Sequence, residues 1–264
     1  KSGETKVSYS GSAGISQFRN GNINMMNSEE LYNRQQQGFR NFYDTQVAAG
    51  VPTFTDQTFD QYLENVLPGS LLASDTDWQS LLTRTGYVNQ HQLSVSGGRE
   101  KTTFYVSGNY YNELGTVLGT EYQNLDFRAN LKHQISDRFT LQTRINAGAN
   151  QAPNEPLGGQ EGTMTQLYNN LPWDPAFEAD GVTPYNPLEP GNTWLGNAKS
   201  NYFYNREHQK DITKNMRFGV DLQLDVNITD WMRFSTTNRV GLAGTDWTQL
   251  LDKHHQLASF ENGR

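Results

Sequence analysis

Few residues in this 264-residue chain have the types and spacing that metal chemistry requires. Asp75, Asp77 and Asp246 carry the oxygen ligands that calcium prefers, but the dense oxygen run and central glycine of an EF-hand loop are missing around them. His254 and His255 could bind a metal as neutral imidazoles. Because adjacent residues on a strand point to opposite faces, we expect these two to be solvated loop histidines. The sequence therefore predicts no metal and no cofactor.

The sequence also lacks the common catalytic motifs. It contains no Gly-x-Ser-x-Gly elbow, no Gly-x-x-x-x-Gly-Lys-Ser/Thr loop and no His-Glu-x-x-His helix. No carboxylate pair for glycoside hydrolysis stands out, since such pairs are defined by separation in space. The absence of cysteine excludes disulfides and cysteine-based zinc sites. A net charge of -7 without a basic stripe argues against nucleic-acid binding, and we expect a protein that is not an enzyme.

Five aromatic residues in a proline-rich segment, residues 151–215, are candidates for contacts with a ligand or partner. They are Trp173, Tyr185, Trp194, Tyr202 and Tyr204. Aromatic faces stack on sugar rings, and a segment stiffened by proline loses less conformational entropy on binding. The alternative is that these side chains only pack the loop against itself or against a covering partner.

The elements that must position this segment form a strand–turn–strand pattern that occurs twice. Residues 124–148 and 217–241 each place a short Ser/Thr-Asp turn between two runs with apolar side chains at every second position, and Ile135 and Ile228 are equivalent positions. Such alternation gives each strand one apolar and one polar face. The charged residues of the polar face include Arg128, Lys132, Arg144, Arg217 and Asp225.

The length of these runs separates two fold classes. Strands of soluble proteins have about 5 to 6 residues, whereas a tilted strand that crosses a bilayer needs roughly 9 to 11. The runs are about ten residues long, which favours a transmembrane β-barrel over a soluble carbohydrate-binding β-sandwich. The mean hydropathy of -0.76 is compatible with a barrel, because only alternate strand residues face lipid. In a barrel, the five charged residues would face the lumen, where they contact a plug or only solvate the interior.

The expected fold is an all-β segment of a large antiparallel barrel. Seven strands are expected, at residues 5–18, 88–96, 102–111, 122–134, 139–150, 214–227 and 232–243. The turn at residues 97–101 is expected to use its glycines for positive φ. Long loops at residues 19–86 and 151–213 are expected outside the cell, with helices at residues 28–50 and 58–66. Because single-chain bacterial barrels have an even number of at least about eight strands, we expect a part of a larger barrel.

Several strand motifs carry a family resemblance. The sequence blocks DWQ (residues 77–79), TGY (85–87), NQHQLSVSGG (89–98) and KTTFYVSG (101–108) resemble the early barrel of SusC/RagA-type TonB-dependent transporters of Bacteroidetes. The opening KSG (residues 1–3) and KVSYSG (6–11) are similar to the exit from that family's plug domain into the first strand.

The resemblance implies a fold, a location and partners. It implies an outer-membrane barrel of about 22 strands with an N-terminal plug, of which this chain would be the part after the plug. It also implies import of a nutrient, an oligosaccharide or a peptide, driven by the TonB complex through a segment that this sequence lacks. The implied partners are a SusD-like surface lipoprotein lid, the protein's own plug, the TonB complex, the substrate and outer-membrane lipid, with no nucleic acid.

Overall fold

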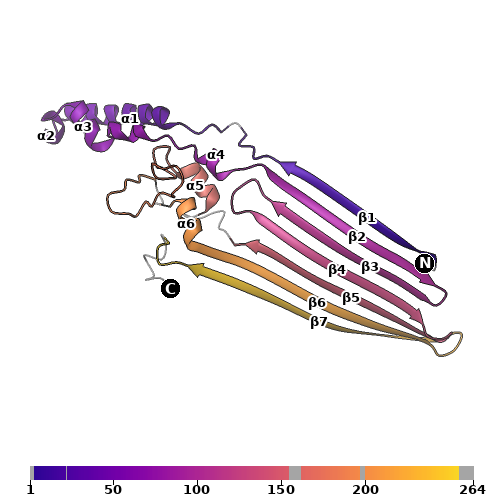
Figure 1. Ribbon diagram of the computed structural model, residues 1–264. Helices are drawn as coiled ribbons and strands as arrows, with labels where there is room; N and C mark the ends of the chain where they lie inside the picture. The colour runs from indigo at the N-terminus through magenta and orange to yellow at the C-terminus, as the bar shows by residue number, and fades with distance from the viewer. Residues whose placement is uncertain (1–2, 22, 155–161, 197–199, 256–264) are drawn as a thin grey trace. The chain divides into compact units, whose positions relative to one another are not determined.

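Seven antiparallel strands form one sheet in which the spatial order equals the chain order (Figure 1). The computed structural model describes residues 3–21, 23–154, 162–196 and 200–255. The strands are β1 (Gly3–Ser16), β2 (Gly86–Arg99), β3 (Thr102–Leu114), β4 (Glu121–Gln134), β5 (Phe139–Pro153), β6 (Gln209–Asn227) and β7 (Arg233–Leu251). The expected antiparallel all-β fold is confirmed.

The chain divides into two compact units. The sheet unit takes its described residues from 1–18, 84–155 and 210–250, and the loop unit takes its described residues from 19–83, 156–209 and 251–264. In the described residues, the helices lie in the connections between β1 and β2 and between β5 and β6.

The strand register places apolar side chains in continuous rows across one face of the sheet. One row of paired residues crosses six strands and consists of Val7, Val95, Val106, Ala129, Ile145 and Val220. Successive residues on a strand point to opposite faces. The neighbouring row therefore belongs to the other face, and it consists of Ser8, Ser94, Ser107, Arg128, Asn146 and Gly219. We call these the apolar face and the polar face.

Large side chains of the apolar face are exposed. Leu125, Phe127, Phe218 and Leu222 are all more than two-fifths exposed, and Val240 on β7 is 66% exposed. In a β-sandwich, a second sheet would pack against such a face. The seven strands of the described residues form a single sheet, so the sandwich alternative has no support.

Six of the seven strands are longer than the sequence pattern indicated, whereas β1 has the expected length of 14 residues but begins and ends two residues earlier than expected. β6 and β7 each have 19 residues, so β7 continues past residue 243 and β6 begins before residue 214. Side-chain alternation fades in these outer parts, but polar side chains bond across the strands. The Trp247 Nε1–H donates to Asp211 Oδ1 at 2.7 Å, and the Thr245 hydroxyl donates to Asn215 Oδ1 at 2.8 Å. Parts of the expected loops are therefore strand.

The two copies of the sequence repeat share one turn geometry. The Ile135 amide donates to the Phe139 carbonyl at 2.9 Å, and the Ile228 amide donates to the Met232 carbonyl at the same distance. In both copies the next amide donates to that carbonyl at 3.2 Å. The repeat in the sequence is therefore a repeat of structure, with each turn joining two neighbouring strands of the sheet.

The turn between β2 and β3 differs from the expectation that glycines supply its positive φ. β2 ends at Arg99 and β3 begins at Thr102, and the residue with positive φ is Glu100, at 45°. Gly97 and Gly98 lie in β2, where a Cβ at Gly98 would collide with the backbone of the paired strand. These glycines therefore permit a close approach of strands and do not form the turn.

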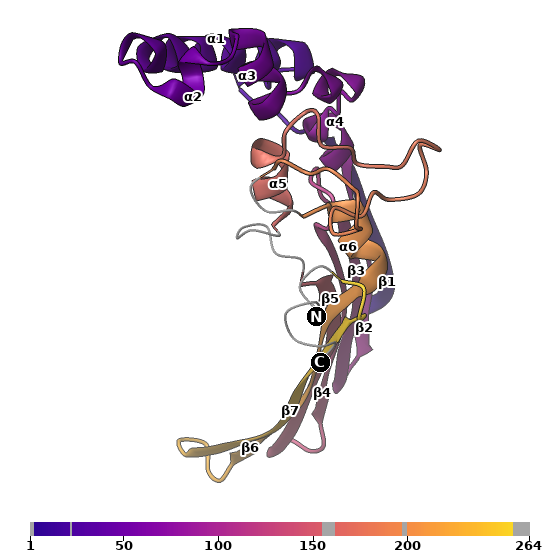
Figure 2. The ribbon, with the colours of Figure 1, turned by 90° about the vertical axis from the view of Figure 1, so that its left-hand side faces the viewer.

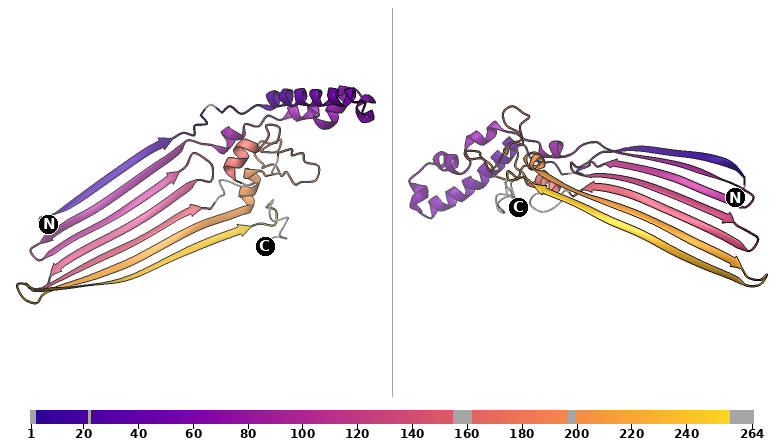
Figure 3. Two further views of the ribbon diagram at one scale, coloured as in Figure 1. Left: turned by 180° about the vertical axis from the view of Figure 1, so that it is seen from behind. Right: turned by 60° about the horizontal axis from the view of Figure 1, so that its bottom comes forward.

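The short turns all lie at one end of the sheet, which is visible where β2 meets β3, β4 meets β5 and β6 meets β7 (Figure 3). The short loop between β3 and β4 lies at the opposite end, where its Gly115 amide donates to the Thr120 carbonyl at 2.7 Å. Seen along its edge, the sheet is curved (Figure 2).

The helices of the loop unit are α1 (Ser28–Ala48), α2 (Pro52–Thr55), α3 (Phe59–Val66), the 3-10 helix η1 (Gly69–Ala73), α4 (Trp78–Leu82), α5 (Thr163–Asn169) and α6 (Tyr202–His208). The expected helix start at Ser28 is confirmed, but Asn27 is the N-cap and forms a capping box with Glu30, with bonds of 2.8 and 3.1 Å. None of the described helices is both long and apolar enough to cross a membrane.

The loop unit has a hydrophobic core of its own. It contains Tyr43, Phe59, Leu63, Leu67, Leu71 and Trp173. The first five residues belong to the connection between β1 and β2, and Trp173 belongs to the connection between β5 and β6. The two insertions therefore share one core. Within the first insertion, the Tyr43 and Phe59 rings are in edge contact, with centroids 5.5 Å apart.

Candidate functional site

Four of the five aromatic candidates are buried in the loop unit. Trp173, Tyr185, Trp194 and Tyr202 are each 9% exposed or less, and Tyr204 is half-buried. Tyr185 stacks on Trp194 with ring centroids 6.4 Å apart, and its hydroxyl donates to the Thr193 carbonyl at 3.1 Å. This burial favours the alternative that the aromatic side chains pack the loop; their contact with a ligand stays a prediction.

A polar cavity of about 560 Å³ lies elsewhere in the loop unit. Its lining includes Asn20, Asn24, Asn27, Asp75, Asp77, Gln79 and Asn170, together with Met25, Met26 and Trp78. We call it the asparagine-rich cavity. Amide side chains both donate and accept hydrogen bonds, and thioether and indole groups give apolar contacts. This combination suits a ligand that carries hydroxyl or peptide groups.

Hydrogen bonds hold the walls of the asparagine-rich cavity in place. Asn20 donates from Nδ2 to Gln79 Oε1 at 2.6 Å and accepts the Tyr168 hydroxyl at Oδ1 at 2.8 Å. The Trp78 indole donates to the Leu171 carbonyl at 3.1 Å. The cavity draws on both insertions, whereas the sequence reasoning considered only residues 151–215. The signal that could have found it is the run of asparagine and methionine in residues 20–27.

The three aspartates considered for calcium do not form one cluster. Asp75 accepts the Ser28 amide at 2.8 Å, at the start of α1, and Asp77 caps α4 by accepting the Ser80 amide at 3.0 Å. Asp246 lies on β7, in the sheet unit. Asp75 and Asp77 therefore have structural roles as helix-end acceptors.

The two adjacent histidines have different surroundings. His255 is buried, and its Nε2 lies 3.1 Å from Gln209 Oε1. His254 is exposed, and its Nδ1 lies 2.7 Å from Asp252 Oδ1. His208, the last residue of α6, completes a group with Asp252 and His254, the one set of three His, Asp or Glu side chains within metal-binding reach among the residues described. Sequence reasoning considered His254 but missed this group, because His208 is far from Asp252 and His254 in the chain.

A buried carboxylate, Asp174, also escaped the sequence reasoning. Its Oδ1 accepts the Leu195 amide at 2.7 Å, and its Oδ2 accepts the Leu171 amide at 3.3 Å. Burial raises the pKa of Asp174 to about 6, although these backbone bonds and one from Gly196 oppose the rise. Asp174 thus ties together two stretches of the second insertion.

All five predicted lumen-facing residues lie on the polar face of the sheet, as the register shows. Three carboxylates of this face have arginine partners. Asp221 receives two bonds from Arg239, at 2.6 and 2.8 Å; Asp225 pairs with Arg233 at 2.7 Å; and Asp126 pairs with Arg217. The pairs neutralise charge on the sheet but leave the face strongly polar.

A hollow of about 540 Å³ lies on the polar face. Five strands contribute to its lining, which includes Lys6, Ser96, Tyr105, Asn130, Lys132 and Arg144. Arg144 donates to Gln223 Oε1 at 3.2 Å. Two of the five predicted lumen-facing residues, Lys132 and Arg144, thus line one concavity that offers cationic and amide groups to a partner surface.

Comparison with known proteins finds relatives that are named TonB-dependent receptors. The chain is 28% identical to TonB-dependent receptor P3 of Formosa agariphila over 134 residues, which is 48% of this chain and 13% of that protein. It is 23% identical to TonB-dependent receptor SusC of Bacteroides thetaiotaomicron over 191 residues, which is 61% of this chain and 18% of that protein. No family model matches the chain.

Solved structures share the fold. A chain of the RagAB peptide importer in the 'open-open' state aligns with 96% of this chain and 29% of its own length, with a TM-score of 0.69 and 17% sequence identity. The 'closed-closed' state of the same importer gives a TM-score of 0.68.

The single meandering sheet with long strands and helical insertions is a segment of a large antiparallel β-barrel. By these similarities the chain is SusC/RagA-like and resembles part of a TonB-dependent receptor. It spans less than a fifth of the length of the curated relatives described above.

Proposed function

We propose that this segment belongs to the barrel of an outer-membrane transporter that imports a nutrient, an oligosaccharide or a peptide, with energy from the TonB complex. The observation that carries the proposal is the continuous apolar face opposite a charged face on strands of 13 to 19 residues. Roughly 9 to 11 residues suffice for a tilted strand to cross a bilayer, so these strands can cross and extend beyond it.

The apolar face is suited to lipid. Monomeric soluble proteins rarely expose contiguous apolar patches larger than a few hundred Å². Within a bilayer the same face leaves no backbone group without a hydrogen bond, because neighbouring strands bond to each other. We therefore infer a location in the outer membrane, with the apolar face toward lipid and Arg128, Lys132, Arg144, Arg217 and Asp225 toward the lumen.

The two edge strands indicate further strands in the whole protein. β1 and β7 each pair with one neighbour in the described residues. An unpaired edge in lipid costs several kcal/mol for each unsatisfied group. We therefore propose that other parts of a larger barrel pair with β1 and β7. The hollow lined by Lys132 and Arg144 then faces the plug, whose surface would supply hydrogen-bond acceptors.

The loop unit is proposed to face the cell exterior and to contact the substrate. Barrels of this type keep long loops outside and short turns in the periplasm. The asparagine-rich cavity offers amide groups that match the hydroxyls of an oligosaccharide and the amides of a peptide equally. A SusD-like surface lipoprotein is proposed as the lid that covers this unit, consistent with the SusC-like and RagAB-like relatives.

Uptake by whole cells tests the proposal. The full-length gene is deleted in its host, and cells are given fluorescently labelled oligosaccharides and peptides as separate pools. One pool should accumulate in the wild type and fail to accumulate in the deletion strain or in a strain without TonB. A full-length protein that fractionates as soluble without detergent, or equal uptake of both pools in all three strains, would contradict the proposal.

A further inference from the structure

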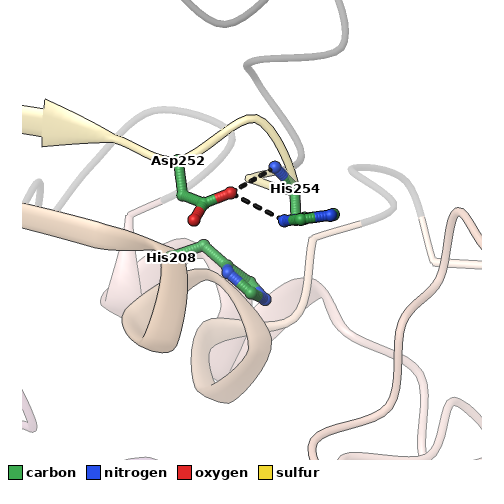
Figure 4. Close-up of side chains that lie close together, drawn as sticks. All are labelled: His208, Asp252 and His254. Atoms are coloured by element: carbon green, nitrogen blue, oxygen red, sulfur yellow. Dashed lines mark hydrogen bonds and ion pairs between the residues drawn. The ribbon is translucent and has the colours of Figure 1, made fainter.

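Three side chains from two separate parts of the chain converge at one place in the loop unit (Figure 4). His208 is the last residue of α6, and Asp252 and His254 lie in the turn that follows β7. One ligand atom from each residue lies within 4.8 Å of the others. The Nδ1 atom of His254 is 2.7 Å from Asp252 Oδ1, and the two imidazole centroids are 5.5 Å apart.

Backbone hydrogen bonds fix the turn that carries two of the three side chains. The Asp252 amide donates to the His208 carbonyl at 2.8 Å, which ties the turn directly to the end of α6. The His254 amide donates to Asp252 Oδ1 at 2.9 Å, and the His255 amide donates to the Asp252 carbonyl at the same distance. The buried His255 contacts Gln209, the residue after His208. Bonds of the main chain therefore hold the turn against the end of α6, and Asp252 Oδ1 contributes one side-chain acceptor.

We propose that His208, Asp252 and His254 bind a divalent first-row transition ion such as Zn²⁺. Metal–ligand distances of about 2.0 to 2.2 Å in a tetrahedral site separate neighbouring ligand atoms by roughly 3.4 Å. The spacing of the described atoms, from 2.7 Å for one pair to at most 4.8 Å, brackets that value. Side-chain rotations that shift the ligand atoms by about 1 Å therefore suffice to form the site.

The ligand types select the ion. Two imidazoles and one carboxylate suit zinc, nickel or copper, whereas calcium and magnesium take oxygen ligands. The imidazole nitrogen that faces Asp252 must be free of its proton, which moves to the other ring nitrogen or to water when the metal binds. Asp252 and His254 are about half exposed, so water can fill the remaining coordination positions.

A simple surface ion pair between Asp252 and His254 is the plain alternative. Such a pair contributes little to stability, about 0 to 1 kcal/mol. It accounts for the 2.7 Å contact but does not involve the His208 ring, which offers a ligand atom within 4.8 Å of those of Asp252 and His254. A bound ion would cross-link α6 to the turn after β7, and this proposal does not depend on transport.

Zinc titration of the purified protein tests the site. The full-length protein without a histidine tag is extracted in detergent, treated with a chelator and titrated with Zn²⁺ by calorimetry. Matched variants are His208→Ala and His254→Ala, and His133→Ala is the control, because His133 lies on β4 in the sheet unit. We expect one zinc-binding event that each cluster variant weakens at least about tenfold and that the control retains.

Cobalt provides a second readout that reports the ligands directly. Co²⁺ in the wild type and in His133→Ala should give visible absorption bands of a nitrogen- and oxygen-ligated site, and the bands should be lost in His208→Ala. Unchanged heat-modifiable gel mobility shows that the variants are folded. Equal zinc binding and equal cobalt spectra in wild type and cluster variants would overturn the proposal, as would a wild type that binds neither ion.

Discussion

The assignment of the two faces of the sheet predicts a large difference between two neighbouring substitutions on β2. Leu93 lies on the apolar face, 51% exposed, between Tyr9 on β1 and Gly108 on β3. Ser94 lies on the polar face, between Ser8 and Ser107. Arginine fits sterically at both positions, because Leu93 has a glycine on one side and Ser94 has serines on both sides. Leu93→Arg and Ser94→Arg therefore add the same charge at the same height of the strand, on opposite faces.

The expected penalty for Leu93→Arg follows from the cost of a charge in lipid. An arginine at the bilayer midplane on the lipid face of a barrel costs about 2 to 4 kcal/mol. This corresponds to a decrease of roughly 30- to 1,000-fold in the ratio of folded to unfolded protein. Ser94→Arg should cost less than about 1 kcal/mol, because its guanidinium remains in a wet, polar lumen.

Urea titration of the full-length barrel refolded into phospholipid vesicles measures both penalties. Heat-modifiable gel mobility gives the folded fraction at each urea concentration. The protein with Leu93→Arg should unfold at a clearly lower urea concentration than the protein with Ser94→Arg. If both variants lost the same stability, or if Ser94→Arg lost more, the assignment of faces would be refuted. In a water-exposed sheet both arginines would change stability by only about 0.5 kcal/mol.

Three further predictions concern the loop unit and one concerns a turn. Trp173→Ala should destabilise the loop core by about 3 to 5 kcal/mol, measured as faster proteolysis of the helical insertions with unchanged barrel mobility. The raised pKa of Asp174 means that the folded unit binds this proton more tightly than the unfolded chain. The stability of the loop unit should therefore fall by up to about 3 kcal/mol as the pH rises from about 4 to about 6. Asp174→Asn should remove that dependence in hydrogen exchange followed across this pH range. Asn24→Leu in the asparagine-rich cavity should weaken substrate binding about 2- to 10-fold in calorimetry, and Asn41→Leu on the exposed side of α1 should not. Glu100→Gly should raise barrel stability by up to about 1 kcal/mol in urea titration, because Glu100 has positive φ.

The central strands could be predicted because strand pairing and the local alternation of apolar and polar residues agree there. Residues such as Phe127 and Phe218 alternate with polar neighbours, and the register brings them into the same row through Ala147. The strand ends could not be predicted from alternation. There, pairing depends on polar bonds between distant residues, such as the one from Trp247 to Asp211. Their partners are not visible in a local pattern.

The sites of the loop unit were harder to predict, because the residues that form each of them come from distant parts of the chain. Aromatic and proline content drew attention to the second insertion, but it did not indicate that Trp173 shares a hydrophobic core with Leu63 and Leu67 of the first. For His254 the local sequence shows no histidine partner beyond its neighbour, because His208, which lies close to Asp252 and His254 in the structure, is far from both in the chain. In both cases the missing information was a contact across a long stretch of sequence.

The shared core of the two insertions affects how substrate selectivity can vary. The sheet is held by backbone pairing between neighbouring strands, and the loop unit is held by its own buried side chains, such as Leu67 and Trp173. Cavity residues such as Asn24 and Met25 are exposed and lie outside that core. Substitutions at these exposed positions change the chemistry offered to a ligand without removing core contacts. Substitutions at the buried aromatics affect both insertions at once, because each insertion forms part of the other's hydrophobic surroundings. If the asparagine-rich cavity binds the substrate, as proposed, selectivity can therefore diverge at the exposed amides while the loop core stays constant.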